Sequence, residues 1–179
     1  MTRAHVASIG AVLALLAAPA ARAASASFVA TADQPLRFGT MVTVSSGSRT
    51  VGADGSTINT GVFPLGDSAS GPAQFTMTWS RATGDRSAYQ LIFQFSLPSV
   101  PNFSKGGVQG SLSGFTTDLA GVPTLAPGQT ATTILPVCVS SSCSVTFHVG
   151  ATLNIVRSTG GGAMTFPLVL LTTVTTVFG

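Results

Sequence analysis

Few side chains in this sequence could carry out acid–base or nucleophilic chemistry. After residue 23 the only histidine is His148, and the alternation of its neighbours places it on the polar face of a strand. A Ser–His–Asp site needs a histidine within reach of a nucleophile. Asp118 and many serines exist, but no Gly-x-Ser-x-Gly turn is present. We therefore interpret His148 as an exposed polar residue without catalytic partners.

The acidic residues are five aspartates, each beside small or hydroxyl-bearing residues that are common in turns. In turns, an Asp carboxylate binds its own backbone. No D-x-D-x-D spacing indicates a calcium loop, and one histidine with one cysteine pair cannot complete a zinc site. We therefore expect no catalytic residue, cofactor or metal, and predict that the protein is not an enzyme. The aspartates are Asp33, Asp54, Asp67, Asp85 and Asp118.

The two cysteines, Cys138 and Cys143, are separated by four residues. In an oxidising compartment such a pair favours a disulfide, and a four-residue loop between paired strands would bring the two Cβ atoms near bonding distance. A redox pair is the alternative, but it requires a C-x-x-C spacing and a charged environment, both of which are missing here. The sequence predicts a structural disulfide.

The elements that carry these residues are predicted to be β-strands. Apolar and polar residues alternate in 74–79, 89–95 and 145–155, which is typical of antiparallel strands with one wet face. Asp54-Gly55 predicts a hairpin, and Gly160-Gly161-Gly162 a flexible turn. The rings of Trp79, Tyr89 and the phenylalanines fall on apolar faces and are expected in the core. No helical spacing occurs, so the residues predict an antiparallel all-β sandwich or barrel.

The C-terminal segment, 164–178, is rich in Thr, Val and Leu and carries no charge. Pro167 interrupts it, which predicts an edge position or a bulge. An uncovered edge of this kind templates pairing with another chain, so self-assembly or binding to a chaperone through edge strands is expected.

The N-terminus has the features of a secretory signal peptide. Arg3 precedes an apolar run from 6 to 18, and Ala21-Arg22-Ala23 matches the small-x-small cleavage pattern. An uncleaved anchor is the alternative, but the run is too short to cross about 30 Å of hydrocarbon. We predict a signal peptide at 1–23 and a single domain at 24–179, exported to the periplasm, cell surface or medium and without a membrane span.

Charge is scarce. Only 7% of the residues are charged, against about 25% in ordinary soluble proteins. Beyond residue 23 there are six basic and five acidic residues, a net charge of +1. No basic cluster exists, so no nucleic-acid partner is expected. Disorder is also excluded, because disordered chains combine high charge with low hydrophobicity.

Several segments, in order along the chain, resemble a secreted proteobacterial family of unknown function. These are the L-x-F-G strand at 36–39, the A-x-F strand at 73–75, the F-T segment at 115–116 and Val149-Gly150-Ala151-Thr152-Leu153. The resemblance implies an immunoglobulin-like sandwich similar to fimbrial subunits and pilins of the spore-coat-U type. The chain departs from the family at 164–167, where Gly-x-Tyr-x-Gly is common, and 122–144 looks like an insertion.

We expect an exported structural or adhesive surface protein, of a fimbria-like kind, without catalytic activity. Two alternatives remain open at this stage. One is a secreted or periplasmic module that binds a ligand through a pocket or an aromatic patch. The other is a small outer-membrane barrel, for which one Trp and one Tyr provide only a sparse aromatic girdle.

Overall fold

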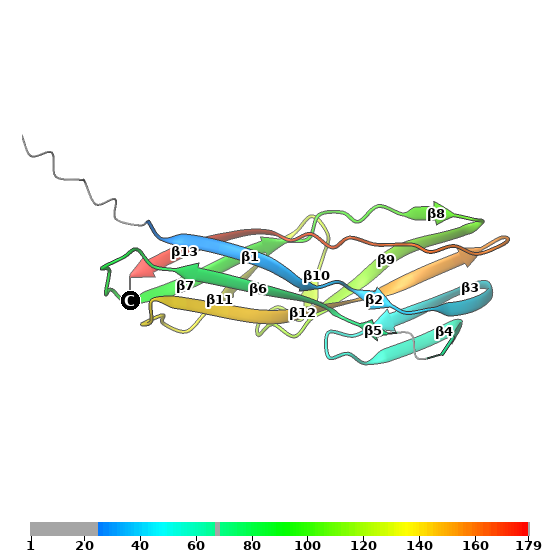
Figure 1. The fold of residues 1–179 in the computed structure, drawn as a ribbon, viewed down its shortest axis with the longest axis horizontal. Coiled ribbons are helices and arrows are strands. Elements are labelled where there is room, and N and C mark those ends of the chain that lie inside the picture. The colour runs from blue at the N-terminus through cyan, green and yellow to red at the C-terminus, as the bar shows by residue number, and fades with distance from the viewer. Residues whose placement is uncertain (1–24, 67–68, 179) are drawn as a thin grey trace, which may run out of the picture.

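The computed structural model describes residues 25–66 and 69–178, and within these ranges every regular element is a β-strand (Figure 1). No helix able to span a membrane occurs in this part of the chain. The strands are β1 (Ser27–Gln34), β2 (Arg37–Phe38), β3 (Met41–Val51), β4 (Thr57–Pro64), β5 (Ser70–Gly71), β6 (Ala73–Ser80), β7 (Tyr89–Ser96), β8 (Phe103–Lys105), β9 (Val108–Thr117), β10 (Thr124–Leu125), β11 (Thr130–Ile134), β12 (Ser142–Arg157) and β13 (Leu171–Phe178). The predicted signal peptide, 1–23, lies outside the described residues.

The strands form two main antiparallel sheets. The larger sheet has the order β1-β6-β12-β3-β4, and β9 joins it by pairing with β12, β8 and β10. The smaller sheet has the order β11-β7-β13, and β2 pairs with β5 separately. The molecule is elongated, with its strands running lengthwise and the small sheet facing the β1-β6-β12 end of the large one (Figure 1). This arrangement confirms the predicted all-β antiparallel sandwich.

Strand β12 joins the two ends of the molecule. Its first half pairs with β6, and its second half pairs with β3 and β9. The predicted alternation is confirmed, because Phe147, Val149, Leu153 and Ile155 are all buried. Strands β6 and β7 alternate in the same way, so each contributes a row of apolar side chains to the space between the sheets.

Aromatic rings hold the two layers together. Phe95 of β7 lies 5.4 Å from Phe147 of β12, measured between ring centroids. Phe28 stacks on Phe93 at 5.3 Å, which joins β1 to β7. These pairs confirm the expected core role for most of the rings. Phe63 is the exception, because 63% of it is exposed.

The predicted hairpin at Asp54-Gly55 is confirmed. It joins β3 to β4, with Val51 opposite Thr57. The Gly52 N–H donates to the Ser56 carbonyl at 2.8 Å, and Gly55 adopts a φ of 81°, which a side chain would disfavour. The stretch 122–144, which looked like an insertion, supplies β10 and β11 and is therefore part of the sandwich.

The C-terminal segment differs from a single long strand. Only Leu171–Phe178 forms β13, which pairs with β7 as the edge strand of the small sheet. Residues 161–170, here called the strap, are extended, but within the described residues they make no backbone hydrogen bonds to a neighbouring strand. Pro167 had been expected at an edge position or in a bulge. It lies instead in the unpaired strap.

Candidate functional site

His148 has a partner, which corrects the expectation that it lacked one. Its ring Nδ1 lies 2.6 Å from Asp118 Oδ2, and its backbone N–H donates to Asp118 Oδ1 at 2.6 Å. Strand alternation turns the ring to the outer face of β12, and Asp118 reaches it from the residue just after β9. The pair therefore ties the end of β9 to the middle of β12.

The electrostatics of this pair favour a charged carboxylate. Burial raises the pKa of Asp118, but hydrogen bonds from the His148 backbone and ring outweigh burial and hold that pKa below its ordinary value. The two side chains are 37% and 42% exposed. Among the described residues no hydroxyl or thiol is hydrogen-bonded to His148 Nε2, so the pair lacks the nucleophile that acyl transfer needs.

The other aspartates divide into two groups. Asp54 and Asp85 act in turns as predicted, each accepting the backbone N–H of the residue two positions ahead at 2.9 Å. Asp33 is different, because it lies in β1 and accepts the hydroxyls of Thr31 and Thr76. Asp67 lies outside the described residues. In 25–66 and 69–178 there is no cluster of three His, Cys, Asp or Glu side chains that could hold a metal.

Cys138 and Cys143 form the predicted disulfide, with their Cα atoms 6.0 Å apart. Its setting differs from the expected loop between two paired strands. Cys138 bridges to Tyr89 of the small sheet, whereas Cys143 is opposite Trp79 in the large sheet. The bond therefore connects the two layers, next to the Trp79–Tyr89 ring pair at 5.2 Å.

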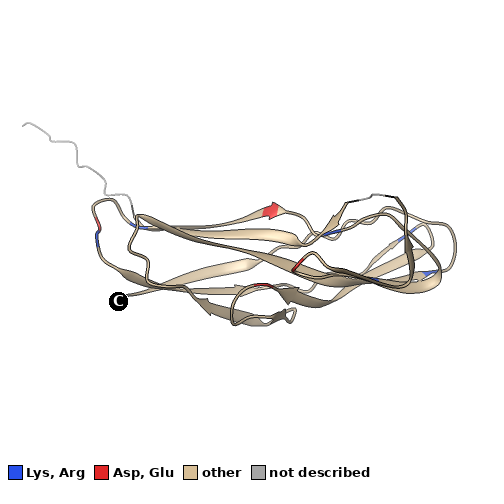
Figure 2. Ribbon diagram, turned by 90° about the horizontal axis from the view of Figure 1, so that it is seen from below, with Lys and Arg blue, Asp and Glu red and all other residues tan. Residues whose placement is uncertain are grey.

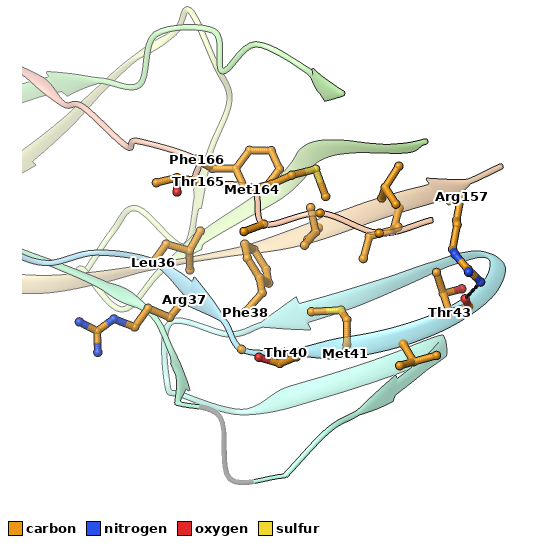
Figure 3. Close-up of a pocket in the computed structure, with 18 of the residues that line it drawn as sticks. Leu36, Arg37, Phe38, Thr40, Met41, Thr43, Arg157, Met164, Thr165 and Phe166 are labelled. Atoms are coloured by element: carbon orange, nitrogen blue, oxygen red, sulfur yellow. Dashed lines mark hydrogen bonds between the residues drawn. The ribbon is translucent and has the colours of Figure 1, made fainter. Parts of the chain in front are cut away.

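A groove lies at the opposite end of the molecule from the disulfide, between the strap and the start of β3 (Figure 3). Its volume is about 820 Å³. The floor is apolar, formed by Val108, Leu153 and Ile155 of β9 and β12, all of them buried. Leu36, Phe38 and Met41 line one wall, and Met164 and Phe166 of the strap line the other.

Side chains rather than backbone bonds hold the strap over this groove. Met164, Phe166, Leu168 and Leu170 alternate inward and pack against the core. Phe166 meets Phe103 edge to face at 4.9 Å. A Cβ on Gly110 of β9 would lie 2.9 Å from the Phe166 ring, so the absence of a side chain there makes room for the strap. At this end of the molecule, one of the two layers therefore consists of the strap alone, without strand pairing.

A second surface feature lies on the outer face of the β3–β4 hairpin. Val42 is directly opposite Phe63 across the two strands. Val44 lies two residues beyond Val42 in β3, and Leu65 lies just after the end of β4. Their exposed fractions run from 44% to 80%. We call these four residues the hairpin patch. Strand β4 is the last strand of its sheet, so the patch lies beside a free sheet edge.

The amino-acid sequence predicts the disulfide and the residues of the core but neither of these surface features. Comparison with known proteins adds one match. A family model described as a domain of unknown function, DUF4402, covers residues 28–166. No curated protein and no solved structure matches the chain significantly. Because the family model spans most of the sequence, from β1 into the strap, the chain belongs to the DUF4402 family.

Proposed function

We propose that this chain is an exported, non-catalytic structural or adhesive surface subunit, of a fimbria-like kind, that assembles with copies of itself through its sheet edges. The observation that carries the proposal is the hairpin patch beside the free edge of β4. An exposed aromatic and three exposed aliphatic side chains on one hairpin are typical of a protein–protein contact.

The edges lack charged side chains, which are one of the usual protections against pairing. Natural edge strands are blunted by charged side chains, above all lysine. Neither β4 nor β13 contains a charged residue. The few charged positions are spread along the length of the molecule (Figure 2). Edge-to-edge contact between two copies would therefore bring together backbone groups and apolar side chains with little repulsion.

Export is supported by two independent features. The first 23 residues have the pattern of a secretory leader, and the disulfide fits an oxidising compartment such as the periplasm or cell surface. A chaperone that covers the same edge before assembly is the partner that this reading implies.

The proposal is tested by analytical ultracentrifugation and electron microscopy of the purified protein. We expect concentration-dependent oligomers, and we expect Phe63→Lys to abolish them because it places a charge at the centre of the patch. Val139→Lys is the matched control, since Val139 is 75% exposed on the disulfide loop, away from the patch. A protein that stays monomeric at all concentrations and forms no assemblies on cells would refute the proposal.

A second candidate function, a ligand-binding module, is favoured by one specific observation. The groove lies within the range of about 300–1,000 Å³ that is usual for small-molecule sites, and its walls are mainly apolar. The two functions are compatible, because Val42 is the only residue of the patch that also lines the groove.

A further inference from the structure

We propose that the groove binds the monomeric anion of a long-chain carboxylic acid, with the alkyl chain on the apolar floor and the carboxylate at Arg157. This site shares only Val42 with the hairpin patch and does not depend on assembly. Three features argue for this ligand class: the apolar lining, the charge at one end, and the way the strap is held.

The lining suits an alkyl chain. Val108, Leu153 and Ile155 form a continuous apolar floor, and Met41 and Met164 face it from opposite walls. Methionine side chains adapt to irregular apolar shapes because they are unbranched and polarisable. Among the described residues that line the groove there is no carboxylate that would repel an anion.

Arg157 supplies an anion contact at one end of the groove. Its Nε donates to the Gly160 carbonyl at 2.7 Å, and its Nη1 donates to the Thr43 carbonyl at 3.1 Å (Figure 3). These two bonds fix the guanidinium plane. Among the described residues, Nη2 makes no hydrogen bond and no acid pairs with Arg157. A bound carboxylate would accept from Nη2 and neutralise a half-buried charge.

The direction of the chain follows from the positions of the lining residues. Arg157 lies at one end of the groove, and Leu36 and Phe166 lie at the other (Figure 3). The second arginine of the lining, Arg37, points away from the groove. The single charged contact is therefore at the Arg157 end, and the methyl end of the ligand would lie between Leu36 and Phe166.

The strap can yield to a ligand at low cost. No backbone hydrogen bonds need to break when it moves, because residues 161–170 make none within the described chain. At the groove, the packing of Met164 and Phe166 on β8 and β9 must shift. Chains of different length could then enter the same groove.

The first test compares laurate with dodecanol, which has the same chain and no charge. Isothermal titration calorimetry of the purified protein should show laurate binding at least about tenfold more tightly, as expected for one charge-assisted hydrogen bond. Labelled methionine methyl groups locate the ligand by NMR. The signals of Met41 and Met164 should shift, and that of Met77, which is fully buried on β6 and does not line the groove, should shift less.

Variants separate the charge from the architecture. Arg157→Met should remove the preference for laurate over dodecanol, whereas Arg157→Lys should keep part of it. Arg86→Met, an exposed arginine between β6 and β7, is the matched control and should change nothing. The ratio of the two affinities is the decisive readout, because loosening of the strap would change both affinities together.

Several results would overturn the proposal. These are no laurate binding, equal affinity for laurate and dodecanol, or methionine shifts confined to Met77. Sedimentation with phosphatidylglycerol vesicles but no binding of free laurate would assign the site to a membrane surface instead. If a second copy of the protein covers Met41 and Met164 at high protein concentration, the groove would be assigned to assembly.

Discussion

Phe147 is one of the residues that join the two layers. It is fully buried in β12, 5.9 Å from Phe75 in its own sheet and 5.4 Å from Phe95 in the small sheet. Replacing it by alanine removes a ring from a closed space, which costs about 3–5 kcal/mol in the free energy of unfolding. Since a domain has about 5–15 kcal/mol in total, Phe147→Ala should leave a folded but much weakened protein.

Urea unfolding followed by Trp79 fluorescence measures this loss, because Trp79 is buried in the neighbouring strand β6. Phe63→Ala is the matched control. It removes the same ring from a position that is 63% exposed and should cost less than about 1 kcal/mol. A double-mutant cycle with Phe95→Ala should give a coupling energy of about 0.5–1.5 kcal/mol for the ring pair. A loss below 1 kcal/mol for Phe147→Ala, or no coupling, would refute the two-layer packing.

Three further predictions concern other parts of the molecule. Replacing both Cys138 and Cys143 by alanine should lower the free energy of unfolding by about 2 kcal/mol, the entropy of a short loop, and a reducing agent should have the same effect on the wild type but none on the variant. Because the pKa of Asp118 is depressed in the folded state, its contribution is present above the unfolded value near 4 and is lost as pH falls through the folded value. Asp118→Asn should therefore flatten the fall in stability below pH 4 and cost within about 1 kcal/mol at pH 7, and an unchanged pH profile would contradict this. In hydrogen exchange, amides of 161–170 should exchange much faster than those of β13, and equal protection would show that the strap is paired.

The sequence was sufficient to predict the strands because their alternation is strict. In β6, β7 and β12 the apolar residues recur at every second position, and the structure buries those residues. The Asp54-Gly55 hairpin and the disulfide were also predictable, since both depend on short-range spacing. Cys138 and Cys143 could be paired from the sequence, but their joining of two layers depends on the packing of β7 against β6, which no local pattern specifies.

The features that the sequence does not predict all depend on contacts between distant segments. His148 and Asp118 are 30 residues apart, and only the pairing of β9 with β12 brings them together. The sequence of the strap has the alternation that is typical of a strand, because every second residue is apolar and points inward. These residues are Met164, Phe166, Leu168 and Leu170. Pairing also requires a neighbouring strand, and β7 ends at Ser96, which is opposite Leu171. The only available signal was Pro167, whose missing N–H is tolerated where no ladder exists.

Concentration-dependent hydrogen exchange of β4 is the most direct test of assembly through the hairpin edge. As the protein is concentrated, the backbone amides of β4 that precede Pro64 should become more protected, whereas those in the centre of β12 should stay unchanged because that strand is already paired on both sides. The Phe63→Lys variant should show no such change. Protection of β4 that is independent of concentration and identical in the variant would contradict the account.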